Sequence, residues 1–542
     1  MANPYFGTPQ TRPIAGREAV MERNDAGGFG FRLDDWQRLD RFLTIGSVGG
    51  TYYVGQRGLT TECREVVVRC LSADGIRTVE AAHAVNVSGR APGTDEQLYV
   101  IMLAMRHGDP DTKVGVAELL PGMLRTGTHT LHFGNMLFSL DAGRRSSRAK
   151  RWLVAEWFEL QDPDDLAFQV VKYQQRDGVA MRDLLRYSHP KAPTPAHAAV
   201  YDWICGRGVA AEPLPKILRD HLHTADAVAA GMPPAEAALE AVKHTRLPRE
   251  ALPPEGLADL RVLTELLGRM PPHALLRNLG SMSSRGLFGP DNPGAEVARA
   301  LVCSRLADRN RLARARVHPF AVLLALLVYS HGQGVRGGRS WAPDAGIRDC
   351  MESAFQEAFV SAEPTGQRIL VAVDVSGSMS AECRGTPLKA ETAAAALAIV
   401  LARTEPDATV CVFDTQVRAV VPVNRNTRVD SLHRFCGGGT DLAAPLTWLN
   451  LSSHPGPVDA VVILTDNETW AGSLHSTEAL AHYRRKVKLP VKLAVCAMTA
   501  TRASVTDPDD PLQLGCAGLD ASLPLVIRNF LSPETRRMAD GA

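Results

Sequence analysis

The sequence predicts two kinds of fold in one chain, a long α-helical stretch followed by an α/β domain with a doubly wound, mostly parallel sheet. From about residue 34 to residue 362, apolar residues recur three and four positions apart, which is typical of amphipathic helices. After residue 363, short apolar runs alternate with helical patterns, which indicates repeated βα units. The chain has 542 residues, and a single core rarely exceeds about 250–300, so at least two domains are expected.

Three parts follow from these patterns. Residues 1–30 contain Pro, Gly and Asn with little periodicity, and we expect an extended arm. Residues 31–362 show many helices with short breaks and no convincing strand alternation, which favours HEAT-like stacking of helix pairs. Residues 363–542 form the α/β domain. The helices predicted most clearly in the second part are Thr61–Leu71, Glu96–Arg106, Lys113–Leu120, Pro163–Arg176, Pro195–Cys205, Pro234–Lys243, Ala295–Leu306 and Pro319–Ser330.

The third part alternates strands with helices, and its apolar strands are typical of a sheet that is covered on both faces. The predicted strands are Ile369–Val375, Ala408–Phe413, Val417–Val423, Asp459–Leu464 and Val491–Met498. The predicted helices are Ala390–Arg403, Ala443–Leu449, Thr477–Lys486 and Leu523–Phe530.

Composition limits the classes of function. The chain has 60 Lys and Arg against 59 Asp and Glu, so any surface that binds nucleic acid must be local. Its longest apolar run, Phe320–Tyr329, is too short to span a bilayer, and the N-terminus has no signal segment. Ten scattered cysteines show no metal-binding spacing, which is typical of reduced thiols. We therefore expect a soluble, cytoplasmic protein with no membrane partner.

Oxygen-bearing side chains follow two of the predicted strands. Asp374, Ser376 and Ser378 stand at the end of the first strand and in the turn after it, and Asp466 stands at the end of a later one. Thr440 follows a run of three glycines between them. The carboxyl ends of parallel strands meet at one edge of a sheet, so these side chains are expected to converge. Two carboxylates and three hydroxyls form a hard-oxygen site that suits Mg²⁺ or Mn²⁺.

Two catalytic interpretations of Asp374 are weaker. A phosphoryl-accepting Asp of the haloacid-dehalogenase kind would have a second Asp two residues on, where this chain has Ser376. A metal-dependent nuclease would need several carboxylates around its ions, whereas three of the five candidate ligands are neutral hydroxyls. No Ser/His/Asp or Cys/His arrangement stands at an informative spacing either. We expect no enzyme.

Basic residues gather between positions 172 and 191. Lys172 and Arg176 are four apart on the predicted helix 163–176 and would share one face, as Arg182 and Arg186 would on the next helix. Such faces are often merely solvated, but together they also form a surface that could bind phosphates. The candidate RNA-binding residues are Lys172, Arg176, Arg182, Arg186, His189 and Lys191.

The ordered set of Asp-x-Ser-x-Ser, a distant Thr and a distant Asp resembles the metal-ion-dependent adhesion site of von Willebrand factor A-type domains. The chain as a whole resembles the Ro ribonucleoprotein (TROVE) family, which includes the Ro autoantigen and its bacterial relatives. The stretches that carry this resemblance are Arg41–Tyr53, Lys172–Gly178, Asp183–His189, Ala274–Gly280, Ala315–Phe320, Glu363–Gly366, Thr465–Thr469 and Asp507–Asp510.

The resemblance implies a ring of helical repeats closed by an A-type domain. It implies that Y-like small noncoding RNA binds the outer surface, with Lys172, Arg176 and His189 at contacting positions. It also implies that single-stranded 3′ ends of misfolded structured RNA enter a central hole. The expected role is RNA quality control, with an exoribonuclease as a further partner. If the ring closes, the aromatic segment from Trp36 to Tyr53 should contact the A-type domain.

One other function stays open. In it the chain is a protein-interaction scaffold whose metal ion binds an acidic residue of a partner. Binding of RNA that weakens steeply with salt would distinguish the first hypothesis from this one.

Overall fold

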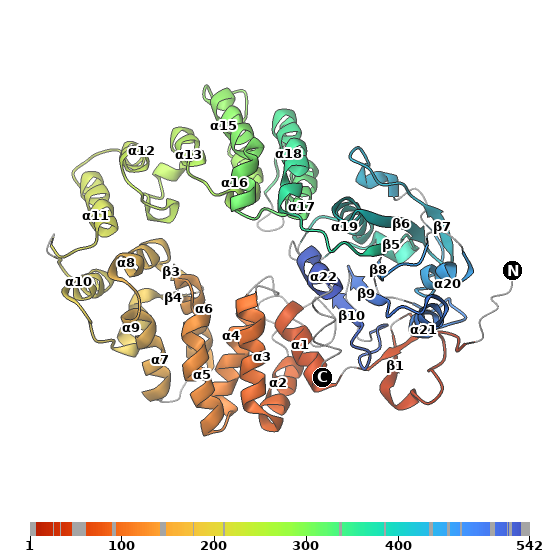
Figure 1. The fold of residues 1–542 in the computed structure, drawn as a ribbon. Coiled ribbons are helices and arrows are strands. Elements are labelled where there is room, and N and C mark those ends of the chain that lie inside the picture. Colours follow the sequence, from red (N-terminus) through yellow and green to blue (C-terminus); the bar gives the residue numbers. More distant parts are fainter. Residues whose placement is uncertain are drawn as a thin grey trace. The chain divides into compact units, whose positions relative to one another are not determined.

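The structure is a computed structural model that describes residues 7–24, 26–32, 34–45, 61–88, 94–140, 148–176, 178–209, 212–334, 339–383, 386–432, 437–452, 456–466, 469–498, 504–517, 519 and 523–532. The chain divides into two compact units, and Figure 1 labels helices and strands of both. The first contains Met1–Val66, Pro271–Ser284 and Val302–Ala542, and the second contains Val67–Met270 and Arg285–Leu301.

The second unit is a row of helices in which each helix packs on its neighbours along the chain. Helix α3 packs on α4 and α5, α4 packs on α6, α8 packs on α10 and α11, and α12 packs on α13. Their bounds are α3 Gly75–Ser88, α4 Asp95–His107, α5 Pro110–Met123, α6 Gly127–Leu140, α7 Arg148–Glu159, α8 Pro163–Lys172, α9 Met181–Ser188, α10 Pro195–Ile204, α11 Lys216–Ala229, α12 Pro234–His244 and α13 Leu260–Leu267. This stacking confirms the predicted helical class. Closure of the helices into a ring stays a prediction.

Capping residues begin several of these helices where the sequence indicates. The side chain of Asp109 accepts a hydrogen bond from Thr112 N, and Pro110 occupies the first turn of α5. Thr194 and Pro195 do the same for α10, with Thr194 Oγ1 accepting from His197 N. A side-chain acceptor satisfies an otherwise unpaired N–H, and proline has no N–H to leave unpaired.

Helix α8 ends four residues earlier than predicted. It stops at Lys172, and Arg176 lies instead on a short strand, β3 (Gln175–Arg176), that pairs with β4 (Val179–Ala180). The prediction that Lys172 and Arg176 share a helix face is therefore wrong. The physical reason is the short connection between the two strands, in which Gly178 takes a φ of +84° that favours glycine. This glycine was visible in the sequence.

The α/β part of the first unit is built on a six-stranded sheet with the order β10-β9-β8-β5-β6-β7. All neighbours are parallel except β7, which runs antiparallel to β6. The strands are β5 Arg368–Asp374, β6 Asp407–Phe413, β7 Val417–Val420, β8 Ala460–Thr465, β9 Lys492–Ala497 and β10 Gln513–Ala517. The doubly wound sheet is confirmed. The sequence analysis missed β10, a short edge strand with a glycine at its centre.

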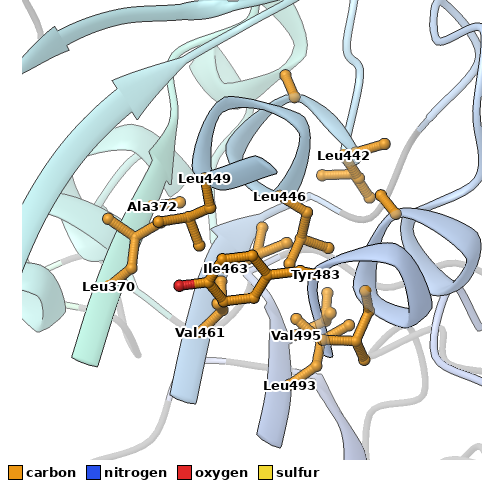
Figure 2. Packing of buried hydrophobic residues seen from close by; sticks show 14 of the residues in the cluster. Leu370, Ala372, Leu442, Leu446, Leu449, Val461, Ile463, Tyr483, Leu493 and Val495 are labelled. Atoms are coloured by element: carbon orange, nitrogen blue, oxygen red, sulfur yellow. The ribbon is translucent and has the colours of Figure 1, made fainter. Parts of the chain in front are cut away.

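Helices cover both faces of this sheet. Helix α19 (Ala390–Thr404) packs on β5, β6 and β8, and α20 (Ala444–Leu451) packs on α21 (Ser476–Val487). Figure 2 shows the core beneath α20 and α21, where Tyr483 lies against apolar side chains of the strands and of α20. The Tyr483 hydroxyl accepts a hydrogen bond from Val458 N at 3.1 Å, so its polar tip is satisfied although the ring is buried.

The N-terminal arm belongs to the same unit as the sheet. Strands β1 (Met21–Arg23) and β2 (Phe29–Phe31) form a hairpin, and Phe31 N donates to Ser504 O at 2.7 Å. Helix α1 (Asp35–Ile45) contacts β10 and buries Phe42 completely. The start of the helical stretch therefore contacts the α/β part of this unit, as expected. Trp36 is half-buried, while Tyr52 and Tyr53 lie outside the described residues.

The remaining helices of the chain are α2 Thr61–Ala73, α14 Pro272–Ser284, α15 Ala295–Ala307, α16 Arg309–Arg314, α17 Pro319–His331, α18 Ala345–Glu357 and α22 Leu523–Leu531. A disulfide joins Cys303 on α15 to Cys350 on α18, with the Cα atoms 5.2 Å apart. The expectation of reduced thiols is wrong for this pair. The two cysteines are 47 residues apart and only the fold brings them together. Among the described residues, no helix is both long enough and apolar enough to cross a membrane.

Candidate functional site

Asp374 lies at the carboxyl end of β5, near the middle of the sheet, and is fully buried. Its Oδ1 accepts from Ser376 N at 2.8 Å and its Oδ2 accepts from Thr465 Oγ1 at 2.6 Å. Burial raises the pKa of Asp374 to about 7, and the negative charge of Asp466 contributes to that rise. The structure therefore brings together the two carboxylates that the sequence placed at separate strand ends.

The two serines of the motif lie in the turn that follows β5. Their hydroxyl oxygens are 3.1 Å apart, close enough for one to donate to the other. Ser376 is buried, whereas Ser378 is exposed. Solvent therefore reaches the cluster at Ser378 but not at Ser376 or Asp374.

Thr440 is held beside this turn by backbone hydrogen bonds. Gly437 N donates to Val375 O at 3.2 Å, and the carbonyl of Thr440 accepts from Trp470 N and Ala471 N. Gly437 has a φ of +139°, which a side chain would disfavour. The glycine loop thus joins the turn after β5 to the segment after β8, and the Thr440 side chain is buried.

These residues fit a divalent cation. The charge of Asp466 contributes to the raised pKa of the buried Asp374, and a bound dication would instead stabilise the charged form of this carboxylate. Within the described ranges, no group of three or more His, Cys, Asp or Glu could hold a metal ion. A site at this position must therefore use hydroxyl oxygens as ligands too. That donor set suits Mg²⁺ or Mn²⁺ rather than zinc.

Two further acids lie around the cluster, and the sequence analysis missed both. Asp414 follows β6 and is fully buried; although burial acts to raise its pKa, hydrogen bonds from Arg418 and from the backbone lower it overall. Its position after a strand resembles that of Asp466 and could have revealed it. Burial raises the pKa of Asp441 to about 6, and Gln10 Nε2 donates to it.

The predicted RNA-binding residues lie on one continuous segment, from the end of α8 through the β3–β4 hairpin to the loop after α9. Lys172 is half-buried, with its Nζ 5.5 Å from the Phe168 ring centroid and 5.1 Å from that of Tyr173. The other five residues are exposed, and they are Arg176, Arg182, Arg186, His189 and Lys191. Arg182 and Arg186 lie four residues apart on α9, as predicted.

His189 has an unusual backbone conformation. It ends α9 with φ 51° and ψ 54°, in the left-handed region that glycine or asparagine usually occupies, and its N–H donates to Leu185 O. Lys191 N donates to Glu159 Oε1 at 2.7 Å, which fixes the following loop to α7. A strained residue held in place by its surroundings favours a functional role for the exposed imidazole.

Comparison with known proteins agrees with this architecture. The Ro60 vWA domain matches residues 368–531, and the TROVE domain matches residues 242–327. The RNA-binding protein RO60 of Deinococcus radiodurans is 36% identical over 537 residues, which is 97% of this chain and 97% of that protein. The chain belongs to the Ro60 family. Its α/β domain is therefore a Ro60 A-type domain, as the motif order predicted.

Two other Ro60 comparisons extend this. The RNA-binding protein RO60 of Caenorhabditis elegans is 26% identical over 94% of this chain and 90% of that protein. The crystal structure of the Deinococcus radiodurans RO (RSR) protein matches with a TM-score of 0.74 and 35% identity, covering 92% of this chain and 100% of that one. The Ro60 relatives are named as RNA-binding proteins and not as enzymes, in agreement with the expectation for this chain.

Proposed function

We propose that this protein binds RNA through the basic surface formed by α8, the β3–β4 hairpin and α9. The observation that carries the proposal is the exposure of five of its six basic residues in a relative of RNA-binding RO60 proteins. Exposed Arg and Lys contact phosphates, and the exposed imidazole of His189 adds a hydrogen-bonding group. Lys172 has a different environment, because two aromatic rings orient its ammonium group.

The proposed ligand is a Y-like small noncoding RNA on this outer surface. A second proposed ligand is the single-stranded 3′ end of a misfolded structured RNA, which would enter the hole of a closed ring. In this proposal the protein acts in RNA quality control in the cytoplasm, with an exoribonuclease as partner. Sequencing the RNA that purifies with the protein tests the first ligand. A structured RNA with a free 3′ tail, compared with the same RNA with the tail paired, tests the second, and equal affinity would contradict threading.

The surface is tested by the double variant Lys172→Ala/Arg176→Ala. We expect RNA affinity to fall about 10–100-fold at fixed salt, and the slope of log K against log salt to decrease by about 0.7–0.9 per lost phosphate contact. The matched control is Arg207→Ala/Arg261→Ala, which removes the same charge from two arginines that pair with acids in the same unit. Equal losses in both double variants would show a general charge effect and contradict the proposed surface.

We also propose a divalent cation, Mg²⁺ or Mn²⁺, held by Asp374, Ser376, Ser378, Thr440 and Asp466. The observation in its favour is the buried pair of carboxylates beside two adjacent hydroxyls. When bound, the ion supplies an electrophilic position for an oxygen ligand. The two carboxylates would balance its charge, and the exposed Ser378 would leave the ion accessible to an acidic group of a partner protein. Binding such a partner would be the scaffold function.

Titration of the full chain with Mn²⁺ tests this site. We expect weak binding, about 10⁻⁴–10⁻³ M, because small dications lose water reluctantly. Asp466→Asn should abolish it, while an exposed acid outside the cluster, such as Glu212, can be replaced by Gln without effect. Retention of Mn²⁺ affinity in Asp466→Asn would exclude the site.

A further inference from the structure

The N-terminal arm forms a strap, which we define as residues 7–24 and 26–32, along the loops of the A-type domain. Gln10 N donates to Gly472 O at 3.0 Å, and Thr8 N donates to Glu478 Oε2 at 3.0 Å. Farther along the strap, the Arg17 guanidinium forms an ion pair with Asp507 at 2.7 Å. The strap is thus attached to the domain at several places, and all of them lie within one compact unit.

The side chain of Gln10 inserts into these loops, and only 1% of the residue is exposed. Its Nε2 donates to Asp441 Oδ1 at 2.7 Å and to Leu474 O at 2.9 Å. Its Oε1 accepts from Thr469 Oγ1 and from Gly472 N. The nitrogen and the oxygen of this amide therefore both have hydrogen-bond partners, which are more than 400 residues away in sequence. A buried amide with all its partners present fixes the segments around it.

Two of these hydrogen bonds connect Gln10 to the residues that follow Thr440 in the chain. Asp441, which Gln10 contacts, is the next residue in the chain, and its Oδ1 also accepts from Ala443 N at 2.9 Å. Thr469 Oγ1 accepts from Leu442 N at 3.2 Å, on the other side of Asp441. Gln10 therefore touches the loop of Thr440 by two routes, one through a carboxylate and one through a hydroxyl.

The chemistry requires an amide at this position. One end must donate to a carboxylate, and the other must accept from a hydroxyl and a backbone N–H. Glutamate could not donate and would put a second negative charge against Asp441, while methionine would keep the volume but lose all four bonds. Metal ligands depend on outer residues that orient them, and removing such a residue typically weakens metal binding about 10–100-fold.

From this network we infer that Gln10 is a positioning residue of the metal centre, and that the N-terminal strap holds the Thr440 loop in its metal-binding conformation. The inference rests on the metal site proposed above. It makes cation binding by the A-type domain dependent on the first residues of the chain. Displacing the strap would then release Thr440 from the ion without any change in the ligands themselves.

The test is Mn²⁺ binding to the full-length Gln10→Met variant, with the wild-type chain in parallel. We expect about tenfold weaker binding, together with faster water-proton relaxation by the bound Mn²⁺, because a water replaces the Thr440 hydroxyl. A general loss of stability would not add a water. Thr440→Ala should show the same relaxation change, and adding Gln10→Met to it should weaken binding no further, since both remove one interaction.

The control is Arg17→Ala, which removes the ion pair of the strap with Asp507 but none of the hydrogen bonds of Gln10. This variant should keep Mn²⁺ affinity within about twofold of wild type. If Gln10→Met does not fold, Thr469→Val breaks the hydroxyl route alone and should weaken binding in the same direction. Wild-type affinity and relaxation in Gln10→Met, or in Thr469→Val, would overturn the positioning role. No Mn²⁺ binding by the wild-type chain would instead contradict the metal site, and the inference with it.

Discussion

The candidate metal centre and the basic surface of α8 and α9 differ in how their residues are held. At the metal centre, Asp374, Ser376, Thr440 and Asp466 are buried, and backbone hydrogen bonds join the turn after β5, the glycine loop and the segment after β8. On the basic surface most of the side chains extend into solvent, and Lys172 is the exception. The residues of the first site are therefore shielded from solvent, whereas most of those of the second are exposed to it. Affinity should therefore depend on different variables at the two sites.

Salt should produce the largest difference between them. Raising salt from 50 to 200 mM should weaken RNA binding about 10³-fold if all six basic residues contact phosphates, since each contact releases counterions. Binding of Mn²⁺ should weaken far less, because buried charges are screened less than exposed ones. Parallel titrations of the same preparation measure both. An RNA affinity that is insensitive to salt would mean that the basic surface is not the contact.

Replacing one buried acid should affect only one of the sites. We expect Asp374→Asn to lose Mn²⁺ binding by at least about 100-fold and to keep RNA affinity within about twofold. The amide oxygen can still accept from Ser376 N, and the repulsion with Asp466 disappears, so the metal-free variant should unfold at the same temperature as wild type or a higher one. Thermal unfolding with and without Mn²⁺ checks this. A large loss of RNA affinity would show that the two sites are coupled.

The same contrast explains what the sequence could predict. Asp374 ends β5 and Asp466 follows β8, two strands with apolar central residues, and the position of such strands in a parallel sheet determines where their carboxyl ends lie. The position of Arg176 depended on where α8 ends, and the pairing of β3 with β4, with Gly178 between them, outweighed the helical spacing. Gln10 had no local signal, because its partners lie more than 400 residues away. Patterns repeated along the chain were predictable, and single contacts between distant segments were not.

His318 is a buried titratable residue outside both sites, and it should make the stability of the fold depend on pH. Burial lowers the pKa of His318 to about 4, and its Nδ1 accepts from Phe320 N at the start of α17. Because the folded pKa lies below the unfolded value of about 6.5, the stabilisation is complete above pH 6.5 and is lost as pH falls toward 4. We expect a loss of about 1–2 kcal/mol in the free energy of unfolding. Urea unfolding at pH 7 and 4.5 measures it, and His318→Asn, which can cap but does not titrate, should show a smaller pH effect. Equal pH effects in both proteins would exclude His318.

The smallest expected effect concerns His189, where two substitutions distinguish the role of the backbone conformation from that of the imidazole. Its left-handed conformation costs about 1 kcal/mol for a residue with a Cβ, and glycine removes that cost. We therefore expect His189→Gly to leave stability unchanged or slightly higher, and His189→Ala to leave it unchanged. Both variants should weaken RNA binding about threefold, because both lose the imidazole and keep the turn. Thermal unfolding and RNA titration at one salt concentration measure the pair. If only the glycine variant binds RNA more weakly, the rigid turn is what the RNA requires. If neither does, the exposed imidazole contributes nothing, and the basic surface binds through its lysines and arginines alone.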